Sequence, residues 1–343
     1  MTSIIAKKLA KKKEEQRSGL ITERINEMLL SAVVMQQRED TGIITKKDFD
    51  IRPLYTLGLS AKKVKKILVN EMLNYRNYFS GTIADRVRRL YISMSLHEEA
   101  YARLYKGNWE IKVNALSELY KMGVETDHAY LLELLNNNDR YIREFARLSL
   151  MKFTKRDPLQ FLRELNEPIS QWEEFEIFLL FQQKNDFTLG SLEGLISLDK
   201  EPTVVSLCLQ LAVYFRQWES VPLILELIQT PDLKLRAEAI TALGKLEATD
   251  SAKYLIAIYP GQAHVIQLKI LATLGMIRSG SYLRFLENEF ISSQDFEIKK
   301  YASDAIIKLY PLSKITIDKL MGNAEALNQK ILNHSLNPLL NTL

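Results

Sequence analysis

The sequence has few of the residues that usually carry chemistry or cross-links. One cysteine, Cys208, stands among 343 residues, so an internal disulfide is excluded. The four histidines are His97, His128, His264 and His334, and none lies at metal-ligand spacing from another or from Cys208. No nucleophile elbow, Walker loop or dinucleotide-binding fingerprint occurs. We therefore expect no metal, no cofactor and no catalytic residues, and we expect Cys208 to be an inert core thiol.

Long apolar runs and helix breakers are also scarce. No stretch reaches the roughly 18–20 apolar residues of a membrane span, and no signal peptide opens the chain. Thirteen glycines and nine prolines suit a helical protein with short turns. The apolar content of 47% and the charged content of 26% are normal for a folded protein. These values predict a soluble, mostly helical chain.

The net charge of +4 is unevenly spread. Residues 1–107 carry 21 Lys and Arg against 12 Asp and Glu, whereas the remainder carries 25 against 30. Two clusters in the basic third invite comparison with phosphate-binding surfaces: Lys62, Lys63, Lys65 and Lys66, and Arg86, Arg88 and Arg89. Neither accompanies a base-reading module, and a nucleic-acid surface needs such charges to converge. We interpret both clusters as solvated helix faces and do not expect nucleic acid to bind.

What the chain has in abundance is an internal repeat of 31 residues. Six positions fall 31 apart and a seventh comes one residue late: Ile111, Ile142, Glu173, Val204, Leu235, Ile266 and Ile298. Each opens a pattern of mainly apolar or small residues four, seven, eight and eleven places later. This spacing marks one face of a helix. Each unit therefore begins with an amphipathic helix, called the first helix below.

A second set of positions repeats with the same period and marks a second helix in each unit. It comprises Leu131, Leu162, Glu193, Ile224, Leu255 and Leu286. A helix pair cannot bury its apolar face alone, so neighbouring pairs must stack. The predicted fold is all-α, a right-handed solenoid of about seven 31-residue helix pairs with helical caps. The predicted divisions are a basic, flexible tail (1–19), a helical N-terminal cap (20–107), the repeat array (108–312) and capping helices (313–343).

The segments "PDLKLRAEAITALGKLEATD" and "NDRYIREFARLSLMKF" resemble HEAT repeats. HEAT units carry an Asp, then an aliphatic–basic pair, then an Ala-rich first helix. The resemblance implies a structural ladder between repeats, formed here by Asp139, Arg143, Asp232, Arg236, Asp295 and Lys299. The copies that start at Glu173, Val204 and Ile266 lack the basic residue.

The segment "LYISMSLHEEAYARLYKGNWEIKVNALSELYKMGV" also resembles a group of bacterial HEAT-repeat proteins whose repeats follow an N-terminal membrane anchor. That resemblance implies a cytoplasmic scaffold beside the inner membrane. The anchor is absent from this sequence, which leaves either a shortened form or a resemblance confined to the repeats. The basic tail offers a weaker membrane contact through Lys7, Lys8, Lys11, Lys12, Lys13 and Arg17. A soluble, charged tail is the alternative.

Two other groups of residues have both a functional and a structural interpretation. Trp109, Trp172 and Trp218 can anchor a partner at the solenoid edge or pack between repeats. Glu173 and Glu176 lie one helical turn apart and could form an acid–base pair. We interpret these carboxylates as part of a solvated face beside a degenerate repeat.

The function predicted from these observations is a non-enzymatic scaffold that binds a protein partner through the solenoid surface. The alternative is a nucleic-acid-binding protein of the DNA-alkylation-repair glycosylase type, which also uses HEAT-like repeats. That use needs a basic concave surface. Second helices usually line that surface, and here they are poor in positive charge. A bilin-type lyase is a weaker option without a supporting residue set.

Overall fold

The computed structural model describes residues 2–34, 49–154, 158–183, 189–323 and 325–337, and these contain helices and no strand. The chain divides into two compact units, Met1–Lys155 and Arg156–Leu343, called unit 1 and unit 2. The all-α prediction is confirmed. Among the described residues no helix is long and apolar enough to cross a membrane.

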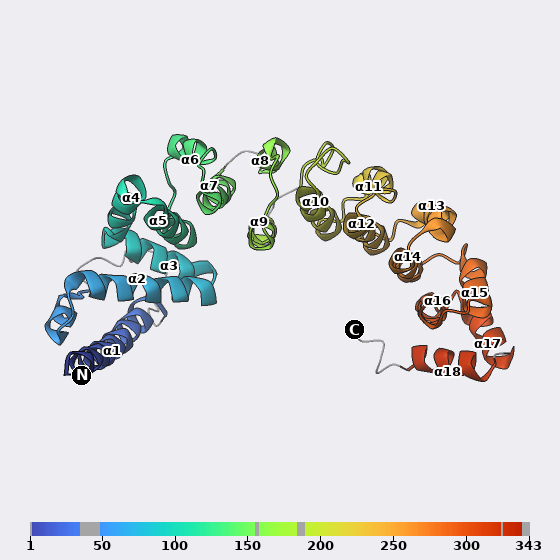
Figure 1. The fold of residues 1–343 in the computed structure, drawn as a ribbon, viewed down its shortest axis with the longest axis horizontal. Helices are drawn as coiled ribbons and strands as arrows, with labels where there is room; N and C mark the ends of the chain where they lie inside the picture. The colour runs from blue at the N-terminus through green and yellow to red at the C-terminus, as the bar shows by residue number, and fades with distance from the viewer. Residues whose placement is uncertain (1, 35–48, 155–157, 184–188, 324, 338–343) are drawn as a thin grey trace. The chain divides into compact units, whose positions relative to one another are not determined.

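The described residues of unit 1 form a series of helices (Figure 1). They are α1 (Thr2–Leu29), η1 (Leu30–Val34), η2 (Arg52–Leu57), α2 (Ala61–Tyr78), α3 (Gly81–Ser93), α4 (Leu96–Lys106), α5 (Trp109–Met122), α6 (His128–Leu134) and α7 (Arg140–Phe153). Ser60 caps α2, as its sequence position predicts, by accepting a hydrogen bond from the backbone N–H of Lys63.

The first helix of unit 1 differs from the prediction. A flexible tail was expected to end at residue 19, but α1 runs from Thr2 to Leu29 without a break. Ile21, Ile25 and Leu29 are fully buried, and α1 packs against α2. The half of α1 before Leu20 has no comparable apolar face. It extends the helix that the second half anchors, and its described side chains are mostly exposed.

Unit 2 continues the repeat with more helix pairs. They are α8 (Leu159–Glu164), α9 (Gln171–Gln183), α10 (Pro202–Tyr214), η3 (Trp218–Ser220), α11 (Val221–Leu227), α12 (Leu233–Lys245), η4 (Thr249–Ser251), α13 (Ala252–Ile258), η5 (Tyr259–Gly261), α14 (His264–Met276), α15 (Leu283–Ser292), α16 (Phe296–Lys308), α17 (Lys314–Asn323) and α18 (Ala326–Ser335).

The helices of unit 2 form two layers. The first helices α10, α12, α14 and α16 pack side by side in sequence order, and the second helices α11, α13 and α15 form the other layer. Within this unit the row of first helices lies on the inner side of the bend (Figure 1). The expectation that second helices line the concave surface is therefore wrong for unit 2. The charge argument built on those helices does not apply to its inner face.

The core follows the 31-residue register closely. In α12 the register positions Leu235, Ala239 and Leu243 are at most 5% exposed. The other register positions of this repeat, Ala242 and Leu246, are buried as well. The repeat that begins with α14 shows the same burial at Ile266, Ile270, Thr273, Leu274 and Ile277. The repeat period therefore identified the side chains that join neighbouring first helices.

Two register positions correct the sequence interpretation. Glu173 was expected on a solvated face, but the register places it in the core and it is 0% exposed. Ile111 was expected in the core, yet it is 41% exposed at the start of α5. In the same helix the register position Glu118 is buried. Its carboxylate accepts hydrogen bonds from the Tyr91 hydroxyl at 2.6 Å and the Arg103 guanidinium at 2.8 Å.

The second helix of the third repeat, expected around Glu193, does not form. Residues 189–200 make turns instead of a helix, although Leu192, Leu195 and Ile196 are buried. Gly194 adopts a φ of +71°, in the left-handed region that interrupts a helix. The apolar period therefore predicted the burial of this segment correctly, while the turn residues determined its backbone.

Candidate functional site

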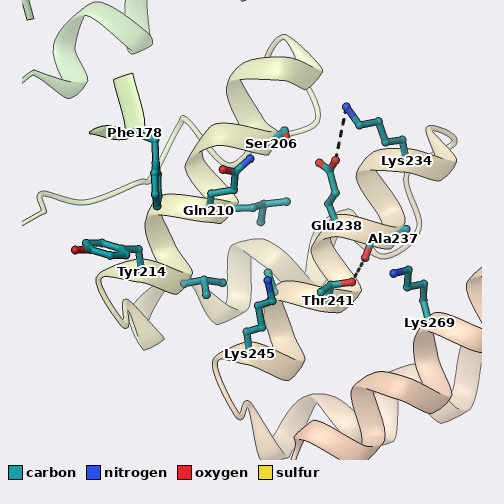
Figure 2. A pocket seen from close by; sticks show the side chains of 13 residues that line it. Phe178, Ser206, Gln210, Tyr214, Lys234, Ala237, Glu238, Thr241, Lys245 and Lys269 are labelled. Atoms are coloured by element: carbon teal, nitrogen blue, oxygen red, sulfur yellow. Dashed lines mark hydrogen bonds and ion pairs between the residues drawn. The ribbon is translucent and has the colours of Figure 1, made fainter. Parts of the chain in front are cut away.

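An open pocket lies on the first-helix layer of unit 2, between α9, α10, α12 and α14 (Figure 2). Its volume is about 600 Å³. The lining combines aromatic, aliphatic, amide, hydroxyl and charged groups. The residues are Phe178, Ser206, Leu209, Gln210, Val213, Tyr214, Lys234, Ala237, Glu238, Thr241, Ala242, Lys245 and Lys269. We call this site the aromatic pocket.

One end of the aromatic pocket is formed by two rings. Phe178 of α9 and Tyr214 of α10 meet edge to face, with centroids 5.4 Å apart and an interplanar angle of 75°. Tyr214 is 49% exposed. Edge-to-face pairs hold both rings in fixed positions. The pocket therefore presents a preformed apolar wall that remains open to solvent.

The other end carries charge. Lys234 and Glu238 of α12 form an ion pair at 3.7 Å, one helical turn apart. Lys245 and Lys269 are exposed and line the same space (Figure 2). Gln210 donates to Glu174, which holds its amide beside the rings. The pocket therefore offers an apolar wall, hydrogen-bonding groups and cations, and its charges are largely positive.

No motif in the sequence marks these residues, although the repeat contains a signal for them. Several lining residues are related by the same 31-residue step, such as Phe178 and Leu209, Gln210 and Thr241, and Tyr214 and Lys245. They occupy the face of each first helix next to the core positions. The exposed positions of the first helices also recur every 31 residues, and this recurrence predicts that these residues line a shared surface.

The three predicted tryptophans are divided between the two units. Trp109 lies at the start of α5 in unit 1 and is 57% exposed. In unit 2, Trp172 is near the N-terminal end of α9, whereas Trp218 follows α10 at its C-terminal end. The Trp218 indole N–H donates to the carbonyl of Leu246 at 3.0 Å. Neither tryptophan of unit 2 is among the residues that line the aromatic pocket.

The acidic members of the predicted ladder cap the first helices. Asp139, Asp232 and Asp295 each accept a hydrogen bond from a backbone N–H in the first turn of α7, α12 and α16 respectively. Such caps satisfy donors that the helix leaves unpaired. For Asp295, the backbone N–H of Ile298 and the nearby His264 lower the pKa of the carboxyl group.

The basic members contact the end of the preceding helix or turn. Arg143 donates to the carbonyl of Asn137 at 2.8 Å, and Arg236 donates to that of Thr230 at 2.8 Å. Lys299 donates to the carbonyl of Phe290 at 3.0 Å. Arg236 and Lys299 also reach forward to side chains of the following repeat, Gln262 at 2.6 Å and Asn328 at 3.1 Å. These contacts tie neighbouring helix pairs together.

The basic residues of α1 lie on a helix. Lys8, Lys11, Lys12, Lys13 and Arg17 are exposed there, and the side chain of Lys7 lies outside the described residues. Leu9 is 60% exposed among these lysines.

Other basic residues of unit 1 have partners within the fold. Lys63 pairs with Glu14, Lys65 pairs with Glu99, and Arg89 pairs with Asp85 at 2.7 Å. Arg86 donates to the carbonyl of Val33 at 3.0 Å. The two clusters considered for phosphate binding are therefore partly neutralised by contacts within unit 1.

Two further chemical features of unit 2 involve buried or clustered groups. Burial raises the pKa of the Cys208 thiol to about 12, which makes it a poor nucleophile at neutral pH. Within the described chain, one group of metal-ligating side chains gathers within 4.8 Å, namely His264, Asp295 and Glu297. All three are exposed, and Asp295 already caps α16.

Comparison with known proteins finds a repeat family that matches part of the chain. Residues 192–275 match the sequence model for HEAT repeats. Among solved structures, human deoxyhypusine hydroxylase in complex with glycerol is 11% identical, with 93% of this chain and 96% of that chain covered and a TM-score of 0.30. The complex of CpcE and CpcF of phycocyanin lyase from Nostoc is 15% identical, with 87% and 96% covered and a TM-score of 0.25. No curated protein matches the sequence.

Proposed function

We propose that this chain is a non-enzymatic scaffold that binds a protein partner through the first-helix layer of unit 2. The observation that carries the proposal is the aromatic pocket, where Phe178 and Tyr214 form an open wall beside amide and ammonium groups. Interface hot spots are typically aromatic side chains ringed by polar contacts. A solenoid also provides an extended surface around such an anchor.

The pocket chemistry supports binding rather than turnover. Glu238 is the one carboxylate among the residues that line the pocket, and it forms an ion pair with Lys234 at 3.7 Å. The buried hydroxyl of Ser206 lies 3.5 Å from Glu174. A nucleophile needs a base held within hydrogen-bonding reach and a third group that orients the base. Ser206 is 6% exposed, and the Glu174 oxygen that it faces already accepts a hydrogen bond from Gln210, so this hydroxyl has little access to a substrate.

A membrane contact through α1 is a second part of the proposal. The helix carries Lys8, Lys11, Lys12 and Lys13 with Leu9 exposed among them. Lysines near an anionic bilayer surface contribute about 1 kcal/mol each to binding. The proposed arrangement is a peripheral one at the cytoplasmic face of a membrane, with the repeats free to bind a partner.

The test of partner binding uses two matched tyrosines. Tyr214 in the pocket is 49% exposed, and Tyr254 on the second helix α13 is 47% exposed. Full-length wild type, Tyr214→Ser and Tyr254→Ser are used as baits in the native host, and bound proteins are quantified by mass spectrometry. Loss of a hot-spot tyrosine weakens binding about tenfold or more.

We expect a partner that wild type and Tyr254→Ser recover equally and Tyr214→Ser loses. Equal recovery by all three baits would contradict the proposed surface. A partner lost only with Tyr254→Ser would move the binding site to the second helices.

A further inference from the structure

A second cavity of unit 2 gathers four basic side chains at the C-terminal ends of the first helices. Arg216, Lys245, Arg278 and Lys308 line a space of about 350 Å³, and all four are exposed. Glu247 supplies the one carboxylate among the lining residues. We call these four residues the basic cluster. Their charges come from α12, α16 and the turns after α10 and α14, so the repeat itself brings them together.

Two residues that line this cavity have an unusual backbone conformation. Arg216 and Glu247 have φ values of +53° and +54°, in the left-handed region that glycine usually occupies after a helix. The Arg216 guanidinium donates to the carbonyl of Lys245 at 3.1 Å, at the end of the next first helix. This bond holds the guanidinium at the rim of the cavity. The charge of Arg216 is therefore held at the C-terminal end of α12.

Two glycines bring the helices of the cluster close together. Gly244 and Gly275 belong to the cavity lining on α12 and α14. A Cβ at Gly275 would lie 2.8 Å from the Cα of Ala305 on α16. The absent side chain therefore allows the close approach of α14 and α16 that places Arg278 near Lys308.

The basic cluster continues directly into the aromatic pocket. Lys245 lines both cavities, and Tyr214 precedes Arg216 by two residues. Lys269 and Lys234 add further cations on the pocket side. The combined surface thus has an aromatic end and a cationic end within one layer of helices, although residues 108–343 as a whole carry more acidic than basic residues.

We propose that the partner presents an acidic peptide segment with one apolar anchor residue. This inference rests on the proposed function and specifies the chemistry of its ligand. The anchor contacts Phe178 and Tyr214, and the carboxylates pair with the basic cluster. Charge complementarity of this kind sets specificity and speeds association. Guanidinium groups suit carboxylates because they can donate two parallel hydrogen bonds.

The carboxylates of the surface itself favour a peptide over nucleic acid. Glu238 lies in the aromatic pocket and Glu247 lies in the basic cluster. A nucleic-acid strand carries a phosphate at every nucleotide and would place some of them beside these groups. A peptide can place neutral residues there and acidic residues opposite the cations.

The test measures fluorescence anisotropy with the purified full chain and three labelled probes. The first is a peptide with one phenylalanine flanked by glutamates, the second replaces those glutamates with glutamines, and the third is oligothymidylate. The protein variants are Lys245→Glu/Arg278→Glu and the matched Lys253→Glu/Arg284→Glu. The second pair lies exposed on the second helices α13 and α15 and changes the net charge equally. Circular dichroism melting checks that each variant is folded.

We expect the glutamate peptide to bind about tenfold or more tightly than the glutamine peptide at low salt, with a loss as salt rises. The Lys245→Glu/Arg278→Glu variant should lose at least about tenfold, and Lys253→Glu/Arg284→Glu should change binding by less than about twofold. Equal effects of the two variants, or tighter binding of oligothymidylate, would overturn the inference.

Different results would contradict the proposed scaffold function and the inference of an acidic segment. A native partner that depends on Tyr214 but tolerates Lys245→Glu/Arg278→Glu would leave the scaffold function intact and refute the acidic segment. Absence of any partner that depends on Tyr214, together with selective binding of the glutamate peptide, would refute only the scaffold function.

Discussion

At the scale of single residues, the same positions perform the same structural task in the repeats that begin with α7, α12 and α16. An aspartate caps the first helix, and a basic side chain four residues later holds the end of the preceding segment. Both kinds of contact satisfy backbone groups at helix ends, where each helix leaves several unpaired. The charged residues of the HEAT pattern therefore contribute here by binding backbone, whereas the residues of the aromatic pocket remain accessible to a partner.

The buried register makes a direct prediction about stability. Leu243 on α12 is 0% exposed, so replacing it by Ala removes buried apolar volume and should cost about 2–5 kcal/mol of unfolding free energy. Leu233 on the same helix is 48% exposed, and Leu233→Ala should change stability by less than about 0.5 kcal/mol. Urea unfolding followed by circular dichroism compares the two. A cost for Leu243→Ala below about half a kcal/mol would show that this face is wrongly placed.

The carboxylate of Asp295, which caps α16, predicts that the stability of the folded state depends on pH. The hydrogen bond from Ile298 and the charge of His264 lower the pKa of this carboxyl group in the folded state. A lowered pKa means that the stabilisation is present above the unfolded pKa, about 4, and is lost as pH falls through the folded value. Asn also caps helices but does not titrate.

Wild type should therefore lose stability relative to Asp295→Asn as pH falls from about 6 to about 2. Thermal melting at a series of pH values measures this difference. A constant difference across that range would contradict the assigned role of the carboxylate.

At the scale of helices, the cost of replacing a glycine by alanine depends on which atoms of the neighbouring helix the added Cβ would meet. A Cβ at Gly275 would lie 2.8 Å from the Cα of Ala305, whereas one at Gly244 would lie 3.1 Å from both the Met276 sulfur and the Thr273 Cγ2. The shorter contact to backbone is the harder one to relieve. Gly275→Ala should therefore destabilise unit 2 by about 1–3 kcal/mol. Gly244→Ala should cost less than Gly275→Ala, because its contacts are longer and Ala favours a helix by about 1 kcal/mol over Gly.

Chemical unfolding of both glycine variants under identical conditions provides the comparison. A smaller loss for Gly275→Ala than for Gly244→Ala would mean that α14 and α16 do not approach each other as described.

The exposed half of α1 predicts binding to anionic lipid. Lys11, Lys12 and Lys13 lie on a helix that Ile21 and Ile25 anchor to unit 1. The triple variant Lys11→Glu/Lys12→Glu/Lys13→Glu should lose co-sedimentation with anionic vesicles at low salt, since each lysine contributes about 1 kcal/mol. Removing residues 1–19 should have the same effect. Neutral vesicles and high salt should abolish binding by wild type. Equal sedimentation of wild type and both altered forms would refute this role for α1.

The elements also show what the sequence can predict and why it fails elsewhere. The apolar period placed the first helices correctly because their core positions recur over the whole array. It failed for the second helix near Glu193, where the left-handed Gly194 interrupts a buried apolar segment. The flexible tail predicted for residues 1–19 from their charges is instead part of α1, because residues 2–19 extend a helix whose stabilising contacts lie further along the chain.

The pocket was harder to predict than the core. Phe178, Tyr214 and Lys245 have no distinctive motif, and only their common 31-residue step relates them. The period does not say which layer lies on the inner side of the bend. The resemblance to HEAT repeats implied that the second helices line the inner side. Within unit 2 the structure instead places the first helices there (Figure 1). The location of the pocket therefore follows from the structure, whereas the core follows from the repeat alone.

At the scale of the molecule, the chain combines two compact units that share one repeat but present different surfaces. Unit 1 carries the exposed lysines of α1, and unit 2 carries the aromatic pocket and the basic cluster. Repeat proteins gain binding surface by adding units without enlarging a single core. We propose that unit 2 uses that surface to bind a partner while α1 contacts a membrane.

The most direct test of this account is site-specific photo-crosslinking in the native host. A photoreactive amino acid replaces Gln210, which is exposed in the aromatic pocket, or Lys253, which is exposed on α13. The account predicts a discrete crosslinked protein from position 210, absent from position 253 and lost when Tyr214 is also changed to Ser. Crosslinking from position 253 alone, or equal crosslinking from both positions, would contradict the claim that the first helices of unit 2 bind the partner.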